Sequence, residues 1–459
     1  MIGQLQTTPT ARRATDQSGY QPLSVRQPPT TSGYHIGFIS TRFAGTDGVS
    51  LETRKWATVL EQMGHRCFYF AGEADTPPQQ SCVVPEAFFA HPYIHALQHV
   101  AFSRVVRPPA LTRHILELKE YLKARIATFV RDFAIKMLVV ENALTIPMHI
   151  PLGLALTEFI AETAMPTIAH HHDFYWERHR FLTNCVDDYL AMSFPPRLPS
   201  IHHVVINSLA AEQLSLHTGS TSILIPNVMD FDHPPQLDQR ESRLRSELGF
   251  SDEEKLILQP TRIVQRKGIE HAVELLSRLG MPARLVISHA SGDEGDDYCR
   301  RVRAFAALLG VRVECVSHRI DDQRRQAATG QQIYALGEIY QQADIVTYPS
   351  LIEGFGNAFL EAVYYHRPIV VNNYPIFSVD IKPKGFRVIE FQDYITDQTV
   401  RETQQVLADP HRAQTMAAHN YEIARHHYSY TTLEQNLRFL LGNQHHQSVR
   451  TQRHARLPL

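Results

Sequence analysis

The sequence predicts an α/β protein made of two doubly wound parallel-sheet domains that face a shared cleft. Between its polar ends, the chain alternates short apolar runs with helical patterns, which is typical of parallel sheets covered on both faces. Residues 229–240 interrupt this alternation with Asp, His, two prolines and Gln, which indicates a linker. The length of 459 residues is enough for two or three domains.

The composition is that of an ordinary soluble globular protein, with 43% hydrophobic and 20% charged residues. Lys and Arg number 45 against 47 Asp and Glu, so no basic field favours a nucleic-acid partner. The five cysteines form no C-x-x-C pair, which argues against a disulfide framework or a zinc knuckle. Since no secretory signal or acylation motif is recognised, we expect a cytoplasmic protein.

No segment is expected to insert stably into a membrane. The most apolar stretch, 143–156, contains two prolines and a histidine and is too short to span a bilayer. The predicted organisation is a disordered arm at 1–33, a first domain at 34–228, a linker at 229–240, a second domain at 241–425, a closing helix at 426–442 and a disordered tail at 443–459.

In the first domain, a strand at 35–40 is followed by a glycine-containing loop at 41–49. A helix from Ser50 to Gly64 comes next, with an apolar face that includes Trp56 and Leu60. Further strands are expected at 137–140, 167–170, 204–207 and 222–225.

The second domain repeats the pattern. An apolar stripe over 269–279, closed by Gly280, predicts a helix. Thr431 with Glu434 three residues later predicts a capping box at the start of the last helix. Strands are expected at 256–259, 284–288, 311–316, 344–348 and 369–372. Since open α/β sheets bind ligands beyond the carboxyl ends of their strands, each domain offers its loops to the cleft.

The sharpest local pattern runs from Tyr348 to Ala362. After a strand, a loop carries Glu353 and two glycines, and a helix starts near Asn357 with Glu361 one turn inside it. The glycines allow close backbone approach, and the helix N-terminus favours an anion. The two carboxylates would flank a ligand with a central phosphate and hydroxyls at both ends. The alternative is a capped surface loop with a solvated glutamate.

A basic loop, 259–268, follows the first strand of the second domain. It places Arg262, Arg266 and Lys267 at the strand's carboxyl end, where the cleft is expected. Guanidinium and ammonium groups together suit a diphosphate that no metal neutralises. The alternative is a solvated basic loop.

A third pattern, 170–178, follows a strand of the first domain. Because side chains alternate along an extended backbone, only His170 and His172 of its three histidines would converge. No other histidine cluster has the spacing to complete a site, so a metal is disfavoured. A histidine that hydrogen-bonds a sugar or phosphate is preferred, with a structural histidine as the alternative.

Two weaker patterns remain. Gly45 and Gly48 have G-x-x-G spacing, which allows close approach to a ligand but does not match a dinucleotide fingerprint. Asp230 and Asp232 have D-x-D spacing, but they lie in the linker and are interpreted as turn residues.

Taken together, these motifs resemble the retaining glycosyltransferases of family 4, which have the GT-B fold of two Rossmann-like domains. The resemblance covers residues 34–441 and is carried by the Glu353-x7-Glu361 motif, Arg262 with Lys267-Gly268, and His172-Asp173. Val228-Met229 replaces the family's usual Gly-Val. Ser288-His289-Ala290 stands where relatives often carry a glycine.

The resemblance implies a catalytic set of Arg262, Lys267, Glu353 and His172. Arg262 and Lys267 would hold the donor diphosphate and stabilise the charge that develops on it. Glu361 would bind the ribose hydroxyls, and Glu353 a hydroxyl of the donor sugar. The loop residues implied to approach the donor are Gly354, Phe355, Gly356 and Asn357.

From the first domain, His172 would touch the donor sugar, while Gly45 and Gly48 would approach the phosphates and the acceptor. The closing helix is implied to cross back onto the first domain. The residues expected to shape the acceptor pocket are Asp173, Trp176 and Arg178.

The expected function is therefore transfer of a hexose, with retention, from a UDP- or GDP-linked sugar to a hydroxyl acceptor. A small soluble sugar or polyol is preferred to a lipid because no basic amphipathic helix marks a membrane-docking face. No metal or other cofactor is expected. Same-face attack is preferred to double displacement through Glu353.

The alternatives are another GT-B enzyme, such as a sugar phosphorylase or nucleotide-sugar epimerase, and a non-catalytic nucleotide-sugar-binding scaffold. The base, the sugar and the oligomeric state are not predicted.

Overall fold

A seven-stranded parallel sheet forms the centre of the first domain, in the order β5-β3-β1-β6-β7-β8-β9. This computed structural model describes residues 33–45, 47–235, 243–291, 295–321 and 323–454, so the arm predicted at 1–33 lies outside the described residues except for Gly33. The strands are β1 (His35–Ile39), β3 (Arg66–Ala71), β5 (Ser81–Val83), β6 (Met137–Glu141), β7 (Thr167–His171), β8 (Ile201–Val205) and β9 (Ser222–Leu224).

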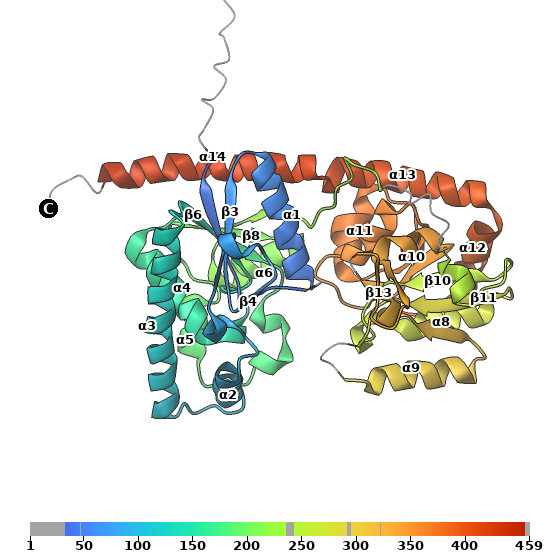
Figure 1. Cartoon of the computed structure of the whole chain (residues 1–459), viewed down its shortest axis with the longest axis horizontal. Helices are drawn as coiled ribbons and strands as arrows, with labels where there is room; N and C mark the ends of the chain where they lie inside the picture. Colours follow the sequence, from blue (N-terminus) through green and yellow to red (C-terminus); the bar gives the residue numbers. More distant parts are fainter. Residues whose placement is uncertain (1–32, 46, 236–242, 292–294, 322, 455–459) are drawn as a thin grey trace, which may run out of the picture. The chain divides into compact units, whose positions relative to one another are not determined.

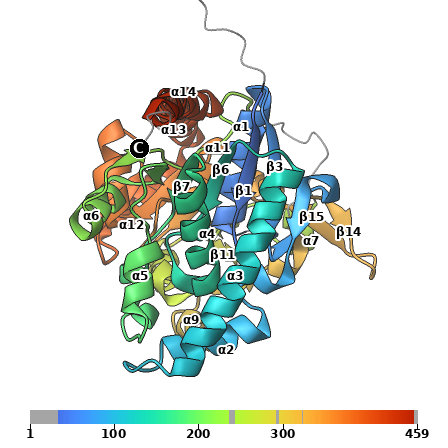
Figure 2. The same cartoon turned by 90° about the vertical axis from the view of Figure 1, so that its left-hand side faces the viewer.

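Helices cover both faces of this sheet (Figures 1 and 2). On one face, β-strand side chains pack with α2, α3, α4 and α5, and α3 lies against α4. On the other, Trp56 and Leu60 of α1 pack against Ile36 and Phe38 of β1. The helices are α1 (Gly48–Gln62), α2 (Pro92–Ala101), α3 (Pro109–Asp132), α4 (Ile150–Thr163), α5 (Asp187–Ser193) and α6 (Ser208–Thr218).

The second domain contains a six-stranded parallel sheet in the order β12-β11-β10-β16-β17-β18. Its strands are β10 (Lys255–Gln259), β11 (Ala283–Ile287), β12 (Arg312–Cys315), β16 (Ile345–Tyr348), β17 (Ile369–Asn372) and β18 (Ile389–Phe391). Side chains of α8, α9 and α12 pack on one face, and those of α10, α11 and α13 on the other. The predicted α/β class with two doubly wound domains is confirmed.

The helices of this domain are α7 (Leu244–Glu247), α8 (Ile269–Arg278), α9 (Asp297–Leu308), α10 (Leu336–Gln342), α11 (Asn357–Tyr364), α12 (Asp397–Ala408) and α13 (Pro410–Tyr428). Two small sheets pair β2 (Arg42–Phe43) with β4 (Glu73–Ala74), and β15 (Gln332–Ala335) with both β13 (Ile320–Asp321) and β14 (Arg325–Gln326). Short helical turns occupy Pro78–Gln80, Pro85–Ala87, Pro147–His149, Tyr175–Glu177, His179–Phe181, Gln265–Lys267, Ser317–Arg319, Phe377–Ile381 and Lys382–Lys384.

The last helix, α14 (Tyr430–His454), packs on the first domain, as the family resemblance implied (Figure 1). Leu433, Leu437 and Leu440 are fully buried in the same cluster as Trp56. The chain therefore leaves the first domain once and returns to it at the end.

The details of this return differ from the prediction. The boundary predicted at 425/426 falls inside α13, and α14 continues through 443–454, where a disordered tail was predicted. No glycine or proline interrupts 443–454, so helical propensity persists without an apolar stripe. The capping box at Thr431 is also wrong. The Ser429 hydroxyl accepts from the backbone N–H of Thr432, and Glu434 pairs with Arg438 instead.

The beginning of the predicted linker is packed rather than free. Phe231 is fully buried, with its ring centroid 5.7 Å from Tyr364 and 5.3 Å from Tyr421. The N–H of Met229 donates to the carbonyl of Tyr428, so the two connections between the domains are tied together. Asp232 accepts hydrogen bonds from Thr431, which fits a role in the local turn. Residues 236–240 of the linker lie outside the described residues.

Candidate active site

The basic loop after β10 and the glutamate loop after β16 touch each other in the second domain. Gly268 has a left-handed backbone (φ 56°), and a Cβ there would lie 2.6 Å from the carbonyl oxygen of Pro349. Only glycine permits this approach, which places Lys267 beside Glu353.

Lys267 and Glu353 form an ion pair in which each side chain is 10% exposed. The Arg266 guanidinium lies 3.4 Å from the same carboxylate. Burial favours the neutral form of Glu353, but Lys267 opposes it and holds the pKa below its ordinary value. Burial also lowers the pKa of Lys267. Arg262 is exposed, and no ion pair is found for it among the described residues.

Glu361 lies in the second turn of α11 and accepts a 2.7 Å hydrogen bond from the Tyr340 hydroxyl of α10. Burial, and to a lesser extent the negative charge of Glu361, raises the pKa of Tyr340 well above its ordinary value. Tyr340 could not be predicted as a site residue, because nothing in its local sequence pattern indicates that α10 lies beside α11.

The glycine loop before α11 has a fixed shape. Gly356 has φ 147°, and a Cβ there would lie 2.6 Å from the hydroxyl oxygen of Tyr374. That hydroxyl donates to the carbonyl of Phe355 at 2.7 Å. The loop therefore presents Gly354, Phe355, Gly356 and the start of α11 in one defined conformation.

Loops of the first domain meet this glycine loop. Asn207 donates through Nδ2 to the carbonyl of Gly354 at 2.7 Å, and Asn227 donates to Oδ1 of Asn357 at 2.7 Å. A Cβ on Gly354 would lie 3.2 Å from the carbonyl oxygen of His172. The structure thus brings the predicted His172 and 354–357 together.

Asn207 was missed as a functional residue, because the fourth strand was predicted at 204–207. Instead β8 ends at Val205, and Asn207 caps α6 by accepting from the N–H of Ala210. Polar residues after a strand of the first domain were the signal that could have identified it.

Of the two glycines of the first glycine loop, Gly48 reaches this region. A Cβ on Gly48 would lie 3.5 Å from Nδ2 of Asn357. Gly45 instead donates its N–H to Asp75 at 3.0 Å on an exposed edge. Asp47 caps α1, accepting from the N–H groups of Val49 and Ser50.

His172 rests on a buried carboxylate that the sequence analysis did not select. Glu141, the last residue of β6, lies with Oε2 2.9 Å from Nδ1 of His170 and 3.1 Å from Nε2 of His172. The ring of His170 stacks on Trp56 at 4.4 Å. Burial disfavours the charge of Glu141, but the two histidines outweigh it and bring the pKa to about 2. Despite its burial, His172 has a raised pKa because of Glu141.

The predicted alternation of the histidines is confirmed. His171 points to the other face of the sheet, where its Nε2 lies 2.9 Å from Nδ1 of His203. Glu141, His170 and His172 are the one group found in the described part of the chain that could hold a metal ion, with ligand atoms within 4.8 Å of one another. Nε2 of His172 hydrogen-bonds the carboxylate of Glu141, whereas both ring nitrogens of His170 are buried without a hydrogen-bond partner among the described residues.

Asp173 and Arg178, predicted near the acceptor, form an ion pair. Asn142 links this pair to His172, because its Nδ2 donates to Asp173 at 3.3 Å and its Oδ1 accepts from the N–H of His172 at 2.9 Å. Trp176 makes its contacts with other residues. Its indole N–H donates to Gln213 of α6 and its ring stacks on His217 at 4.3 Å, so its contacts are structural.

Two further charged groups lie on this loop. Glu177 is exposed, yet its pKa is raised to about 7. The larger cause is desolvation by the surrounding protein, and the smaller is the negative charge of Asp173. Arg180 is also exposed, and surrounding protein together with Arg178 lowers its pKa. Charged side chains that are exposed but partly desolvated by surrounding protein are expected where the surface is concave.

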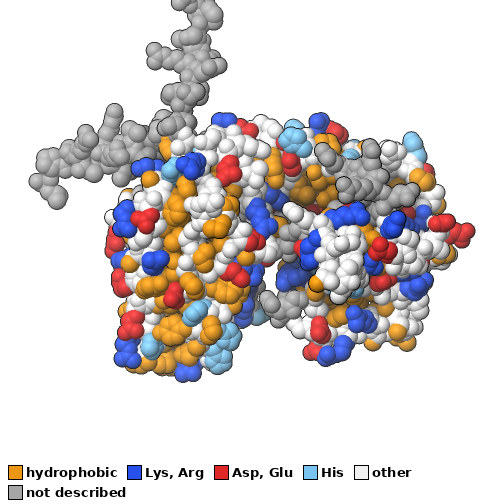
Figure 3. Space-filling model, viewed as in Figure 1, with side chains coloured by type: hydrophobic (Ala, Val, Ile, Leu, Met, Phe, Trp, Pro, Cys, Tyr) orange, Lys and Arg blue, Asp and Glu red, His pale blue; other side chains and the backbone are white. Residues whose placement is uncertain are grey.

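On the face shown in Figure 3, basic and acidic side chains are interspersed and form no continuous basic field. Within the described segments, no helix combines the length and hydropathy required to cross a membrane.

Comparison with known proteins agrees with this geometry. The model of the family "Glycosyl transferases group 1" matches residues 240–423. A mannosylglucosylglycerate synthase of Petrotoga mobilis is 31% identical over 385 residues, covering 77% of this chain and 86% of that protein. A mannosylglucosylglycerate synthase of Thermotoga maritima is 29% identical over 438 residues, covering 87% and 97%.

Among solved structures, a glycosyltransferase of Rickettsia africae superimposes with a TM-score of 0.64 at 13% identity, covering 89% of this chain and 98% of that one. This likeness supports the fold. The sequence relatives and the family model support the activity, and the chain belongs to the group 1 glycosyltransferases of GT-B fold.

Proposed function

We propose that this glycosyltransferase moves a mannosyl group, with retention and without a metal, from a nucleoside diphosphate-linked mannose to a hydroxyl of a glucosylglycerate acceptor. The sugar and the acceptor are taken from the names of the two synthases it resembles. The observation that carries the proposal is the buried Lys267–Glu353 pair beside the N-terminus of α11, with His172 next to the same loop.

The donor diphosphate is assigned to the space around Lys267, Arg262 and the first amides of α11. As the glycosidic bond breaks, negative charge grows on the leaving phosphate, so fixed cations there stabilise the transition state more than the ground state. Arg262 is exposed and available for this purpose. Glu361, held by Tyr340, is assigned to the ribose hydroxyls.

The donor sugar is assigned to the space between Glu353 and His172. Glu353 is ionised and can accept a hydrogen bond from a sugar hydroxyl, but Lys267 and Arg266 already bind it. A carboxylate paired with two cations is a weak nucleophile. We therefore favour same-face attack, in which the leaving phosphate receives the proton of the acceptor hydroxyl, over double displacement.

The acceptor is assigned to the loop 173–180 of the first domain. Glucosylglycerate carries a carboxylate, and this loop carries two guanidinium groups, of which Arg178 is neutralised by Asp173. Arg180 remains as the cation for the acceptor carboxylate. This assignment narrows the predicted small sugar or polyol acceptor to a sugar acid.

The test is a transfer assay with GDP-mannose, GDP-glucose, UDP-glucose and UDP-mannose as donors and glucosylglycerate as acceptor. Nucleotide release and mass spectrometry should give a product one hexose heavier than glucosylglycerate with a mannose donor. NMR should find the same anomeric configuration in donor and product. EDTA should leave the rate unchanged.

Transfer of glucose in preference to mannose would overturn the donor assignment, and an inverted product would overturn retention. Loss of activity in EDTA that is restored by a divalent ion would overturn metal independence. The Lys267→Ala and Glu361→Gln variants should abolish the thermal stabilisation given by the free nucleoside diphosphate. Lys382→Ala removes an exposed lysine paired with Glu390 and serves as the control.

A further inference from the structure

Three side chains converge inside the first domain, at the carboxyl ends of the neighbouring strands β6 and β7. They are Glu141, His170 and His172. Glu141 and His170 are fully buried, and 10% of the His172 side chain is exposed. Oε2 of Glu141 lies 2.9 Å from Nδ1 of His170 and 3.1 Å from Nε2 of His172. One carboxylate and two imidazoles thus point at a common centre.

Hydrogen bonds satisfy only part of this cluster. Nε2 of His172 bonds to Oε2 of Glu141. In contrast, Nδ1 and Nε2 of His170 and Oε1 of Glu141 are buried without a hydrogen-bond partner among the described residues. A neutral imidazole carries one N–H and one lone pair, so His170 has both a donor and an acceptor unpaired. A buried polar atom left unpaired costs about 1–3 kcal/mol, and three of them together point to a ligand that pairs with them.

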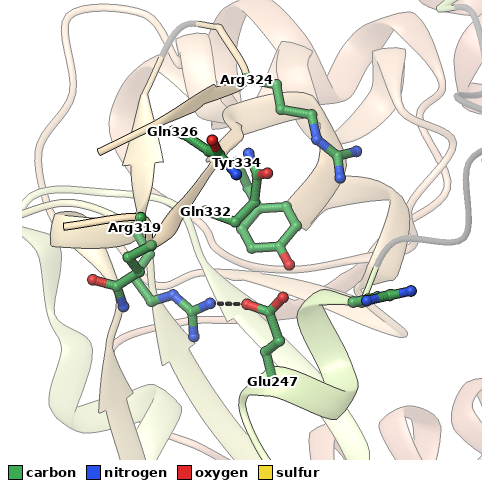
Figure 4. A pocket seen from close by; sticks show the side chains of 9 residues that line it. Glu247, Arg319, Arg324, Gln326, Gln332 and Tyr334 are labelled. Carbon is green, nitrogen blue, oxygen red and sulfur yellow. Dashed lines mark hydrogen bonds and ion pairs between the residues drawn. The ribbon is translucent and has the colours of Figure 1, made fainter. Parts of the chain in front are cut away.

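Two arginines that line a cavity of the second domain, by contrast, are paired with protein carboxylates. This cavity of about 710 Å³ lies between α7 and the small sheet of β13, β15 and β14 (Figure 4). Arg319 pairs with Glu247, and Arg324 with Glu338. The carboxylate of Glu141 has no such partner of fixed opposite charge in the described part of the chain. Its two partners are imidazoles.

This donor set suits zinc. Zn²⁺ binds histidine nitrogen and carboxylate oxygen at about 2.0–2.2 Å, and many zinc sites have three protein ligands and an open fourth position. Ligand atoms of a tetrahedral site of this size lie about 3.3 Å apart, close to the two separations from Glu141. Mg²⁺ and Ca²⁺ prefer oxygen ligands alone. The exposed edge of His172 gives an ion a path to the site.

Neighbouring groups hold the two histidines in place. The ring of His170 lies 4.4 Å from that of Trp56 and 4.4 Å from that of His172. The N–H of His172 donates to Oδ1 of Asn142 at 2.9 Å. Ligands that are already fixed lose little conformational entropy when an ion binds. Two converging histidines alone disfavoured a metal in the sequence, and β6 supplies the third ligand.

We propose that Glu141, His170 and His172 bind a zinc ion, and that this ion inhibits the transfer reaction. The inhibition rests on the proposed function, in which the ion-free enzyme is the active form. His172 adjoins the donor loop, since a Cβ on Gly354 would lie 3.2 Å from its carbonyl oxygen. A bound ion adds positive charge beside the donor sugar, whose reacting carbon becomes cationic in the transition state. Like charges repel, so occupancy lowers kcat.

The binding test is calorimetric titration of the chelator-treated, full-length chain with ZnCl₂, with MgCl₂ as the control ion. We expect one Zn²⁺ per chain and no Mg²⁺. Glu141→Gln, which preserves the shape of the side chain, should weaken Zn²⁺ by about 100-fold or more, since residues that merely support ligands already contribute about 10–100-fold. His170→Phe retains an aromatic ring beside Trp56 and should have the same effect. Circular dichroism verifies that both variants fold.

His426→Gln is the matched control, because it removes an exposed histidine of α13 and should leave the affinity unchanged. Two further readouts locate the ion. Trp176→Phe leaves Trp56 as the one tryptophan of the chain. Bound Co²⁺, which occupies zinc sites, should quench the fluorescence of Trp56, and His170→Phe should remove this quenching. Crystals soaked in ZnCl₂ should show an anomalous scattering peak between Glu141 and the two histidines.

In the transfer assay, ZnCl₂ should lower the kcat of the wild type several-fold, and EDTA should restore it. His170→Phe should keep its own ion-free rate when ZnCl₂ is added. The absence of binding to the wild type would overturn the proposal, as would equal binding to the wild type and His170→Phe. An anomalous peak found only at surface histidines would also overturn it.

Binding without loss of kcat would overturn the inhibitory role, and a rate that rises with zinc would overturn both this role and the proposed metal independence. The titration, the fluorescence and the scattering peak do not depend on which sugar the enzyme transfers. A chain that binds zinc at Glu141 but transfers no mannose would therefore refute the proposed function and leave the zinc site established.

Discussion

Lys267 and Glu353, 86 residues apart in the sequence, form an ion pair whose two side chains are each only 10% exposed. Charges removed from water in this way lose solvation that their mutual attraction does not reliably recover. A buried pair at the carboxyl ends of two adjacent strands is therefore more readily explained by substrate binding than by stability. The glycine at 268 allows the two loops to approach closely enough to form it.

Lys267→Met should lower kcat/KM by about 10²-fold or more, because the donor diphosphate loses a cation that acts in the transition state. It should also destabilise the fold by about 3–5 kcal/mol, because Glu353 is left buried without its lysine. Denaturant unfolding and steady-state kinetics measure the two effects.

The double variant Lys267→Met/Glu353→Gln separates stability from catalysis. Removing both charges should recover most of the lost stability, while activity should stay low. Recovery of both quantities would contradict the assigned role of Lys267.

Local sequence patterns located much of this site. Lys267, Glu353, Glu361 and His172 each follow an apolar run that predicts a strand, and strand ends of one parallel sheet share an edge. Their proximity within each domain could therefore be predicted. Several strands were not predicted, but this did not affect the inference because they carry none of these residues; they are β2, β3, β4, β5, β13, β14, β15 and β18.

The remaining residues required the three-dimensional structure. Glu141 ends an ordinary apolar strand, and only the neighbouring strand β7 gives it two histidine partners. Tyr340 becomes relevant only because α10 packs beside α11. The family resemblance implied that Trp176 shapes the acceptor pocket, but its ring packs against α6, which local sequence could not reveal.

Tyr340→Phe should raise the donor KM about three- to tenfold with little change in kcat. A hydrogen bond to a charged group contributes about 1.5–3 kcal/mol, and only part of this energy is transmitted to the donor through Glu361. Glu361→Gln should weaken nucleotide binding more, because the acceptor of the ribose hydroxyls is itself neutralised. Titration with the free nucleoside diphosphate measures both. Tyr365→Phe is the control, because Tyr365 stacks on Tyr340 and no hydrogen bond from its hydroxyl to Glu361 is found among the described residues.

Glu141→Gln should shift the pH dependence of kcat/KM. In the wild type, Glu141 raises the pKa of His172 and keeps it protonated to higher pH. Without that charge, burial dominates and the pKa of His172 falls, so the alkaline decline in activity should begin at lower pH. A profile that changes in height but not in position would indicate a structural role only.

Acid should destabilise the fold through buried neutral histidines. His149 is 2% exposed, accepts from the N–H of Leu152 through Nδ1 and donates through Nε2 to the carbonyl of Glu86. Burial lowers its pKa to about 4. The unfolded chain, with an ordinary histidine pKa of about 6.5, binds this proton first. Stability is therefore complete above about pH 6.5 and falls as the pH approaches about 4.

For His149 alone, the loss amounts to about 3 kcal/mol at full titration. Unfolding in urea at about pH 7.5 and about pH 5 measures the part of this loss that falls between the two pH values, about 2 kcal/mol. His149→Asn preserves a helix-capping side chain but does not titrate, so its stability should change less between the two pH values. An equal change in the variant and the wild type would assign the acid sensitivity to other groups.

Arg180 should determine acceptor charge selectivity if the proposed acceptor is correct. It is exposed, its neighbour Arg178 is already paired with Asp173, and the protein around it reduces its solvation. A carboxylate that binds there gains a charge-assisted contact worth about 1.5–3 kcal/mol. Arg180→Gln should therefore raise the KM for glucosylglycerate about tenfold or more. The KM for glucosylglycerol, which lacks the carboxylate, should remain within about twofold of the wild-type value, because a neutral acceptor never made that contact. Equal losses with both acceptors would indicate that Arg180 supports the loop rather than the carboxylate. Failure of either compound to accept a sugar would instead refute the proposed acceptor itself.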